Sequence, residues 1–110
     1  LAFGSDHPIA DLDPMRGLYR AVMRLSEDKL PEGGWCPNEK LSLADSIKAY
    51  TIGSAYQMWN EKITGTLEIG KFADIAVIDR NLFEVDPEEI LEATAVMTML
   101  GGKIIYNSQE

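Results

Sequence analysis

Cysteine and histidine are scarce in this sequence: among 110 residues there are one cysteine, Cys36, and one histidine, His7. A single cysteine forms no internal disulfide, so we expect a reducing, cytoplasmic environment. Cys36 lies in a loop rich in glycine and proline, far along the chain from His7, which favours a plain loop cysteine over a nucleophile. One histidine is also too few for a complete catalytic zinc site, which takes about three protein ligands.

Long apolar runs and an excess of basic residues are missing as well. No stretch approaches the ~20 apolar residues of a membrane span, and the start lacks the basic and apolar segments of a signal peptide. The net charge is −8, from 18 acidic and 10 basic residues. This charge argues against nucleic acids and anionic membrane surfaces as partners.

The composition itself is that of a globular domain, with 45% hydrophobic and 25% charged residues. The first residue is not Met, and residues 1–5 (LAFGS) predict the end of a buried strand followed by a turn. We therefore expect the chain to be part of something larger.

The rest of the chain predicts two helices, a long loop and a mainly β region. Residues 14–25 predict a helix with Asp13 as N-cap, and residues 42–58 a second helix that Ser42 begins. Residues 26–41 form a loop long enough to suggest a functional role. A strand over 72–79, a short helix over 86–93 and a hairpin over 95–106 with a Gly-Gly turn complete the chain.

The segment GSDHP, residues 4–8, admits a structural and a functional interpretation. Asp6 in a turn often bonds nearby backbone N–H groups. The same carboxylate, placed just past a buried strand, would lie where β/α barrels carry their active sites. Asp11 and Asp13 follow closely and add oxygen ligands for a hard cation, although Asp13 is better used as a helix cap.

Residues 65–72, GTLEIGKF, spell the G-x-x-x-x-G-K pattern of a phosphate-binding loop. Phe72 stands where a Ser or Thr would hold Mg²⁺, and the residues that follow predict a strand rather than a helix. The pattern therefore predicts a structural turn.

Three longer motifs carry a family resemblance. The run G-x-L-E-x-G-K-x-A-D-x-x-V-x-D at 65–79 and the run V-x-T-x-x-x-G-K-x-I-Y at 96–106 resemble the C-terminal end of metal-dependent amidohydrolases. Upstream, GSDHPI with DPMRGLYRAVMR is similar to the branch called amidohydrolase family 3, near D-aminoacylases and related imidohydrolases. The resemblance covers nearly the whole chain.

The resemblance implies a fold class of α/β type. Members of this family hold one or two divalent metals, usually zinc, in a (β/α)8 TIM barrel, and a small composite β-sandwich packs beside it. By this analogy residues 1–62 are the C-terminal end of the barrel, with its last strand and helices. Residues 63–110 are then part of the sandwich domain.

The resemblance also assigns roles to two residues. Asp6 matches the aspartate at the end of the eighth barrel strand, which ligates the metal and takes a proton from the attacking water. His7 follows where the branch varies, which implies a substrate contact. The family's other ligands are a His-x-His pair, a bridging Lys or carboxylate and two further histidines, and this chain matches none of them. We therefore expect the chain alone to be inactive and to bind no metal.

The resemblance thus implies a hydrolase of C–N bonds in linear or cyclic amides, with a small amide as substrate and Zn²⁺ as cofactor of the complete enzyme. The loop 26–41 would border the substrate opening. One alternative is a non-catalytic structural or interaction module derived from an amidohydrolase tail. Another is a self-contained hydrolase that uses Asp6, His7 and Asp11. The apolar side of helix 42–58 would be uncovered in this chain, which predicts a homo-oligomer.

Overall fold

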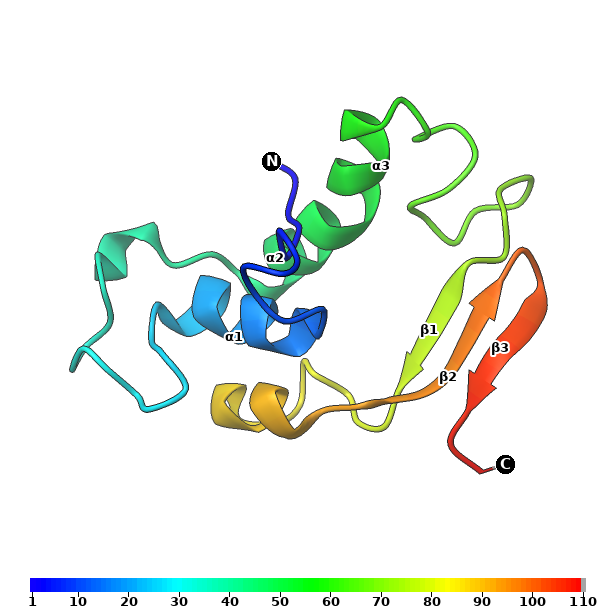
Figure 1. The fold of residues 1–110 in the computed structure, drawn as a ribbon. Coiled ribbons are helices and arrows are strands. Elements are labelled where there is room, and N and C mark those ends of the chain that lie inside the picture. Colours follow the sequence, from blue (N-terminus) through cyan, green and yellow to red (C-terminus); the bar gives the residue numbers. More distant parts are fainter. Residues whose placement is uncertain (110) are drawn as a thin grey trace.

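The computed structural model, which describes residues 1–109, places a group of helices beside a small antiparallel sheet (Figure 1). This arrangement confirms the α/β character of the chain. In order, the elements are α1 (Pro14–Met23), the 3-10 helix η1 (Pro37–Glu39), α2 (Leu43–Lys48), the π-helix η2 (Ala49–Gly53), α3 (Ser54–Gln57), β1 (Ile75–Ile78), the 3-10 helix η3 (Pro87–Glu92), β2 (Ala95–Leu100) and β3 (Lys103–Asn107).

The predicted helix starts are confirmed by their capping bonds. Asp13 Oδ1 accepts the Met15 N–H at 2.9 Å, and Ser42 Oγ accepts the Asp45 N–H at 3.1 Å. Asp86 caps η3 in a reciprocal capping box. Each cap satisfies a backbone donor that the first turn of a helix leaves free, so the short polar residues before each helix fix where it begins.

The predicted strand over residues 1–5 does not form. Residues 1–5 carry no strand structure, and Leu1 is 82% exposed. A strand needs a neighbouring strand to bond its backbone, whereas here the Phe3 N–H donates to the Ala49 carbonyl of η2 at 2.9 Å. The N-terminal residues therefore dock on a helix.

The predicted helix over 42–58 is present but not uniform. It runs as α2, the π segment η2 and α3, so its middle turn is wider than an α-helical turn. Gly53 lies at the end of η2, and a Cβ there would collide with the carbonyl oxygen of Leu1. The absence of a side chain at Gly53 therefore allows the N-terminal segment to approach the helix closely.

The C-terminal region is one sheet of three antiparallel strands in the order β1-β2-β3. Gly101 and Gly102 have φ values of 56° and 83° and form the predicted hairpin turn. β1 is shorter than the predicted strand 72–79. A second sheet, which a complete sandwich would need, does not occur within residues 1–109.

The buried core lies between α1 and η3, which Figure 1 shows beneath α1 in yellow and orange. Tyr19 is fully buried, and Ile90 and Ala93 are 1% and 3% exposed. The core therefore joins side chains from both parts of the chain. The predicted domain boundary between residues 62 and 63 stays a prediction. Within the described residues, no helix combines the length and apolar character that crossing a membrane would require.

Candidate functional site

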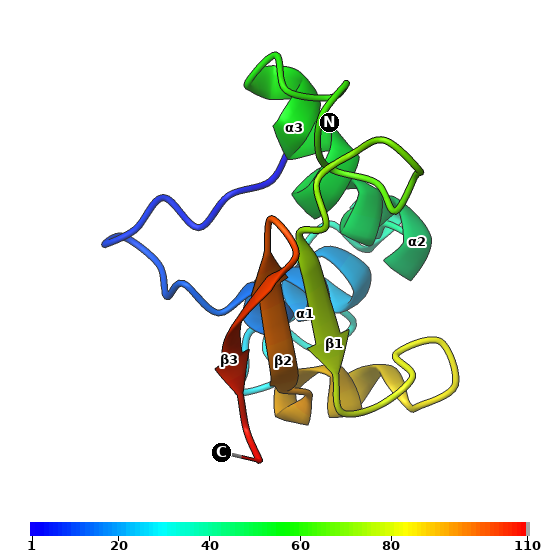
Figure 2. The same ribbon diagram turned by 90° about the vertical axis from the view of Figure 1, so that its right-hand side faces the viewer.

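Asp6 lies in an exposed turn between the docked N-terminus and α1. Its backbone has a positive φ of 52°, and its carbonyl accepts the Ile9 N–H at 2.8 Å. Figure 2 shows the blue segment before α1 arching away from the rest of the chain. Among residues 1–109 the Asp6 carboxylate makes no hydrogen bond or ion pair. Its oxygens are therefore free to bind a ligand.

The neighbouring candidates do not join Asp6. His7 is exposed, Asp11 pairs with Arg16 at 3.6 Å, and Asp13 caps α1. Within the described part of the chain, no three His, Cys, Asp or Glu side chains converge on a common point that could hold a metal ion. This geometry argues against a self-contained hydrolase built from Asp6, His7 and Asp11.

The segment before Asp6 is fixed by the helix region 49–54. Besides the bond from the Phe3 N–H to Ala49, Ser54 Oγ donates to the Phe3 carbonyl at 2.7 Å. The Phe3 ring meets Tyr50 edge to face, with 5.2 Å between ring centroids. Residues 1–3 thus have a defined place although they form no strand.

A cavity of about 360 Å³ lies between this segment and α1. Its lining includes Ser5, Tyr50 and the side chains of Arg16 and Arg20. Both arginines pair with Glu27, at 3.6 and 2.9 Å. Burial raises the pKa of the Tyr50 phenol above its ordinary value, so this group stays neutral and can donate a hydrogen bond.

A larger and mainly apolar cavity of about 750 Å³ lies between the helices and β1. Neither Asp6 nor His7 lines either of these two cavities. The candidate catalytic carboxylate therefore lies beside the smaller cavity and outside both.

The loop 26–41 folds against the end of α1. The Arg24 guanidinium stacks 4.8 Å from the Trp35 ring centroid, and its Nε donates to the Trp35 carbonyl at 2.9 Å. Cys36 is an exposed free thiol. That this loop borders a substrate opening stays a prediction.

The acidic and basic residues of the run 65–79 serve the fold. Lys71 Nζ donates to the Glu61 carbonyl at 2.7 Å and pairs with Glu68 at 3.0 Å, so it is engaged within the turn. The prediction of a structural turn in place of a phosphate-binding loop is confirmed. Asp74 accepts the Gly101 N–H at 2.8 Å and the Thr64 hydroxyl at 3.0 Å.

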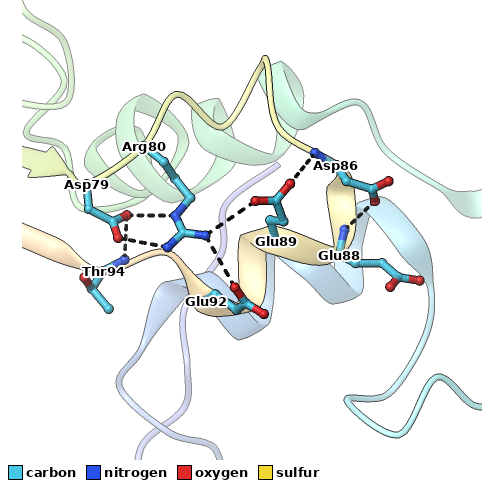
Figure 3. Close-up of polar contacts among 7 residues, drawn as sticks. All are labelled: Asp79, Arg80, Asp86, Glu88, Glu89, Glu92 and Thr94. Atoms are coloured by element: carbon cyan, nitrogen blue, oxygen red, sulfur yellow. Dashed lines mark hydrogen bonds and ion pairs between the residues drawn. The ribbon is translucent and has the colours of Figure 1, made fainter.

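Asp79 follows β1, at the opposite end of this strand from Asp74. Figure 3 shows its polar contacts. Its carboxylate accepts the Thr94 N–H at 3.1 Å and two bonds from Arg80 at 3.1 and 3.0 Å. Arg80 Nη1 also lies 3.8 and 3.6 Å from Glu89 and Glu92 of η3. The bonds from Arg80, and next the Thr94 N–H, hold the pKa of Asp79 below its ordinary value.

Sequence reasoning missed the role of Ser54, which lies within the predicted helix 42–58. The Ser54 partner Phe3 lies 51 positions away in the chain. The small residues around Gly53 were the signal that another segment approaches here.

Comparison with known proteins identifies the family. The model of the amidohydrolase family matches residues 1–106. YtcJ of Bacillus subtilis, whose name assigns it to the amidohydrolases, is 34% identical over 105 residues, which is 96% of this chain and 20% of that protein. Protein LONG AFTER FAR-RED 3 of Arabidopsis thaliana is 32% identical over 96% of this chain and 18% of its own length.

The N-substituted formamide deformylase of Arthrobacter pascens is 26% identical over 96% of this chain and 19% of its own length. The chain thus spans about a fifth of the length of these curated relatives. No solved structure matches it. Because the family model covers almost every residue, the chain belongs to the amidohydrolase family.

Proposed function

We propose that this chain is the C-terminal part of a metal-dependent hydrolase that acts on C–N bonds in linear or cyclic amides. The observation that carries the proposal is the family match, which includes the segment around Asp6. A carboxylate without partners among the described residues suits such a role. The name of one relative, N-substituted formamide deformylase, indicates small N-acyl compounds as the substrate class to try first.

The proposed hydrolase would hold one or two divalent metal ions, Zn²⁺ first among them, and the described residues supply one ligand for such a site. Asp6 offers an exposed, unpaired carboxylate, which is a suitable oxygen ligand. The described residues bring no further ligand to it, so the remaining ligands would come from outside them. Such a metal, when bound, lowers the pKa of water and polarises the substrate carbonyl.

The chain's own contribution to the reaction would be proton transfer at Asp6. One carboxylate oxygen accepts a proton from the attacking water and later delivers it to the leaving nitrogen. His7, which follows it and is also exposed, would contact the substrate.

The proposal includes the place of the chain in a barrel enzyme. Residues 1–62 would close a (β/α)8 barrel, with α2, η2 and α3 as its last helix. Residues 63–110 would be part of the small composite β-sandwich domain.

The alternative is a non-catalytic module that keeps the amidohydrolase tail. The coding sequence upstream of Leu1 separates the two. A His-x-His pair followed by a lysine and two further histidines supports the enzyme, and a start codon close to Leu1 supports the module.

The test of the catalytic role is Asp6→Asn in the complete protein. Asn keeps the size of the side chain but neither carries the proton nor supplies the charge. General acid–base catalysis contributes roughly 10²–10⁴-fold, so we expect kcat to fall by at least about 100-fold. Near-normal turnover of this variant would contradict the assignment.

We further propose a cytoplasmic homo-oligomer. Large apolar side chains are exposed outside the core, among them Trp59 at 86% and Leu67 at 79%, and such surfaces favour association. Multi-angle light scattering of the purified protein should give a mass above that of one chain. A single-chain mass at micromolar concentration would contradict this.

A further inference from the structure

Ser54, the first residue of α3, connects the N-terminal segment to the helix region. Its hydroxyl lies 2.7 Å from the Phe3 carbonyl oxygen and 3.0 Å from the Ala49 carbonyl oxygen. The Ala49 oxygen also accepts the Phe3 N–H at 2.9 Å. The backbone of Phe3 is therefore tied at both its donor and its acceptor to one turn of the helix region.

That turn is the π segment η2, between α2 and α3. π segments are rare and occur frequently at functional sites. Here the wide turn brings the Ala49 carbonyl and the Ser54 hydroxyl to the same neighbour. Gly53 completes the contact, because a Cβ at that position would collide with the Leu1 carbonyl.

Tyr50, also in η2, holds the Phe3 side chain. The Phe3 ring packs edge to face on Tyr50, and the Tyr50 hydroxyl occupies the space that a Cβ of Gly17 in α1 would fill. Tyr50 is thus wedged between Phe3 and α1. Side chain and backbone of Phe3 are both fixed, three residues before Asp6.

We propose that Ser54 is a positioning residue for Asp6, acting through the backbone of Phe3. The inference rests on the catalytic role proposed for Asp6. Between Phe3 and Asp6 lie only Gly4 and Ser5, so movement of Phe3 moves the carboxylate. Misplacement of a reacting group by about 1 Å can cost about 10²-fold in rate. A hydroxyl 51 positions from Phe3 in the chain thereby controls where the Asp6 carboxylate lies.

The test compares Ser54→Ala, Ser54→Thr and Thr51→Ala in the complete protein. Thr keeps the hydroxyl at position 54. Thr51 is the matched control, because its hydroxyl bonds the Ile47 carbonyl at 2.8 Å inside the same helix region and is not bonded to residues 1–3. Each variant is measured by amide hydrogen exchange, followed by mass spectrometry of peptides covering residues 1–6, and by kcat and KM for simple N-acyl amines, beginning with formanilide.

Loss of one hydrogen bond is worth a factor of roughly 2–10, so Ser54→Ala should speed exchange in residues 1–6 by about that factor. Its kcat should fall roughly 10- to 100-fold while KM changes little. Ser54→Thr keeps the hydroxyl, so its exchange rate and kcat should stay close to those of the unsubstituted protein. Thr51→Ala should leave both the exchange rate and kcat unchanged.

Unchanged exchange in Ser54→Ala would overturn the proposal, and so would faster exchange with an unchanged kcat. Failure of the catalytic role itself would be seen separately, as normal turnover of Asp6→Asn. In that case the exchange data would still report whether Ser54 holds Phe3.

Discussion

The molecule contains two kinds of aspartate, and they lie in regions of opposite character. Asp6 projects from an exposed turn, and its carboxylate has no partner among the described residues. Asp74 and Asp79 bracket β1, and each carboxylate accepts a backbone N–H from a residue flanking β2, Gly101 or Thr94.

With the role proposed for Asp6, the difference separates a carboxylate that serves the reaction from carboxylates that serve the fold. The carboxylates of Asp74 and Asp79 accept hydrogen bonds at the two ends of the β1–β2 ladder and stabilise its register. The Asp6 carboxylate has no partner among the described residues, which suits the ligand-binding role proposed for it. Substitutions of the two kinds should therefore change different measured quantities.

The largest effect on stability is expected for Asp74→Ala. It removes the acceptors of both the Gly101 N–H and the Thr64 hydroxyl. Bonds to charged groups are the stronger ones, so unfolding should become easier by about 1–3 kcal/mol, measured by urea denaturation. Asp74→Asn retains one acceptor oxygen and should lose less. Equal stability of Asp74→Ala and the unsubstituted protein would contradict the structural role of Asp74.

A smaller and pH-dependent effect is expected for Asp79→Asn. The pKa of Asp79 is lowered, first by the bonds from Arg80, so its contribution is complete well above the ordinary value of 3.8 and is lost as the pH falls below it. The substitution should lower the urea midpoint at pH 7. The difference from the unsubstituted protein should then shrink as the pH falls below 3.8.

A constant difference between these two proteins from pH 7 to acid pH would contradict the role of the Asp79 charge. Arg80→Gln is the matched control, because it removes the first cause of the low pKa and leaves the Thr94 bond in place. It should reproduce part of the pH-dependent loss.

Local chemistry made several elements predictable from the sequence. The caps at Asp13, Ser42 and Asp86 act within their own helices, and the Gly-Gly turn needs only the φ freedom of its two residues. At 87–92 the start of the predicted short helix was right but the turn is 3-10, since a segment this short gains little from α-helical bonding.

Elements that depend on distant partners were not predictable in this way. The expected strand at 1–5 has no neighbouring strand, and the π segment η2 is coupled to Phe3 across half the chain. The place of Asp6 after an apolar run was readable from the sequence. The hydroxyl of Ser54 that fixes the preceding residues was not.

The most direct measurement compares Asp6→Asn with Asp79→Asn in the complete protein, by the kcat and the urea midpoint of each variant. We predict that Asp6→Asn keeps its midpoint and loses at least about 100-fold in kcat. Asp79→Asn should unfold at a lower urea concentration and keep its kcat. Near-normal turnover in Asp6→Asn would contradict the account.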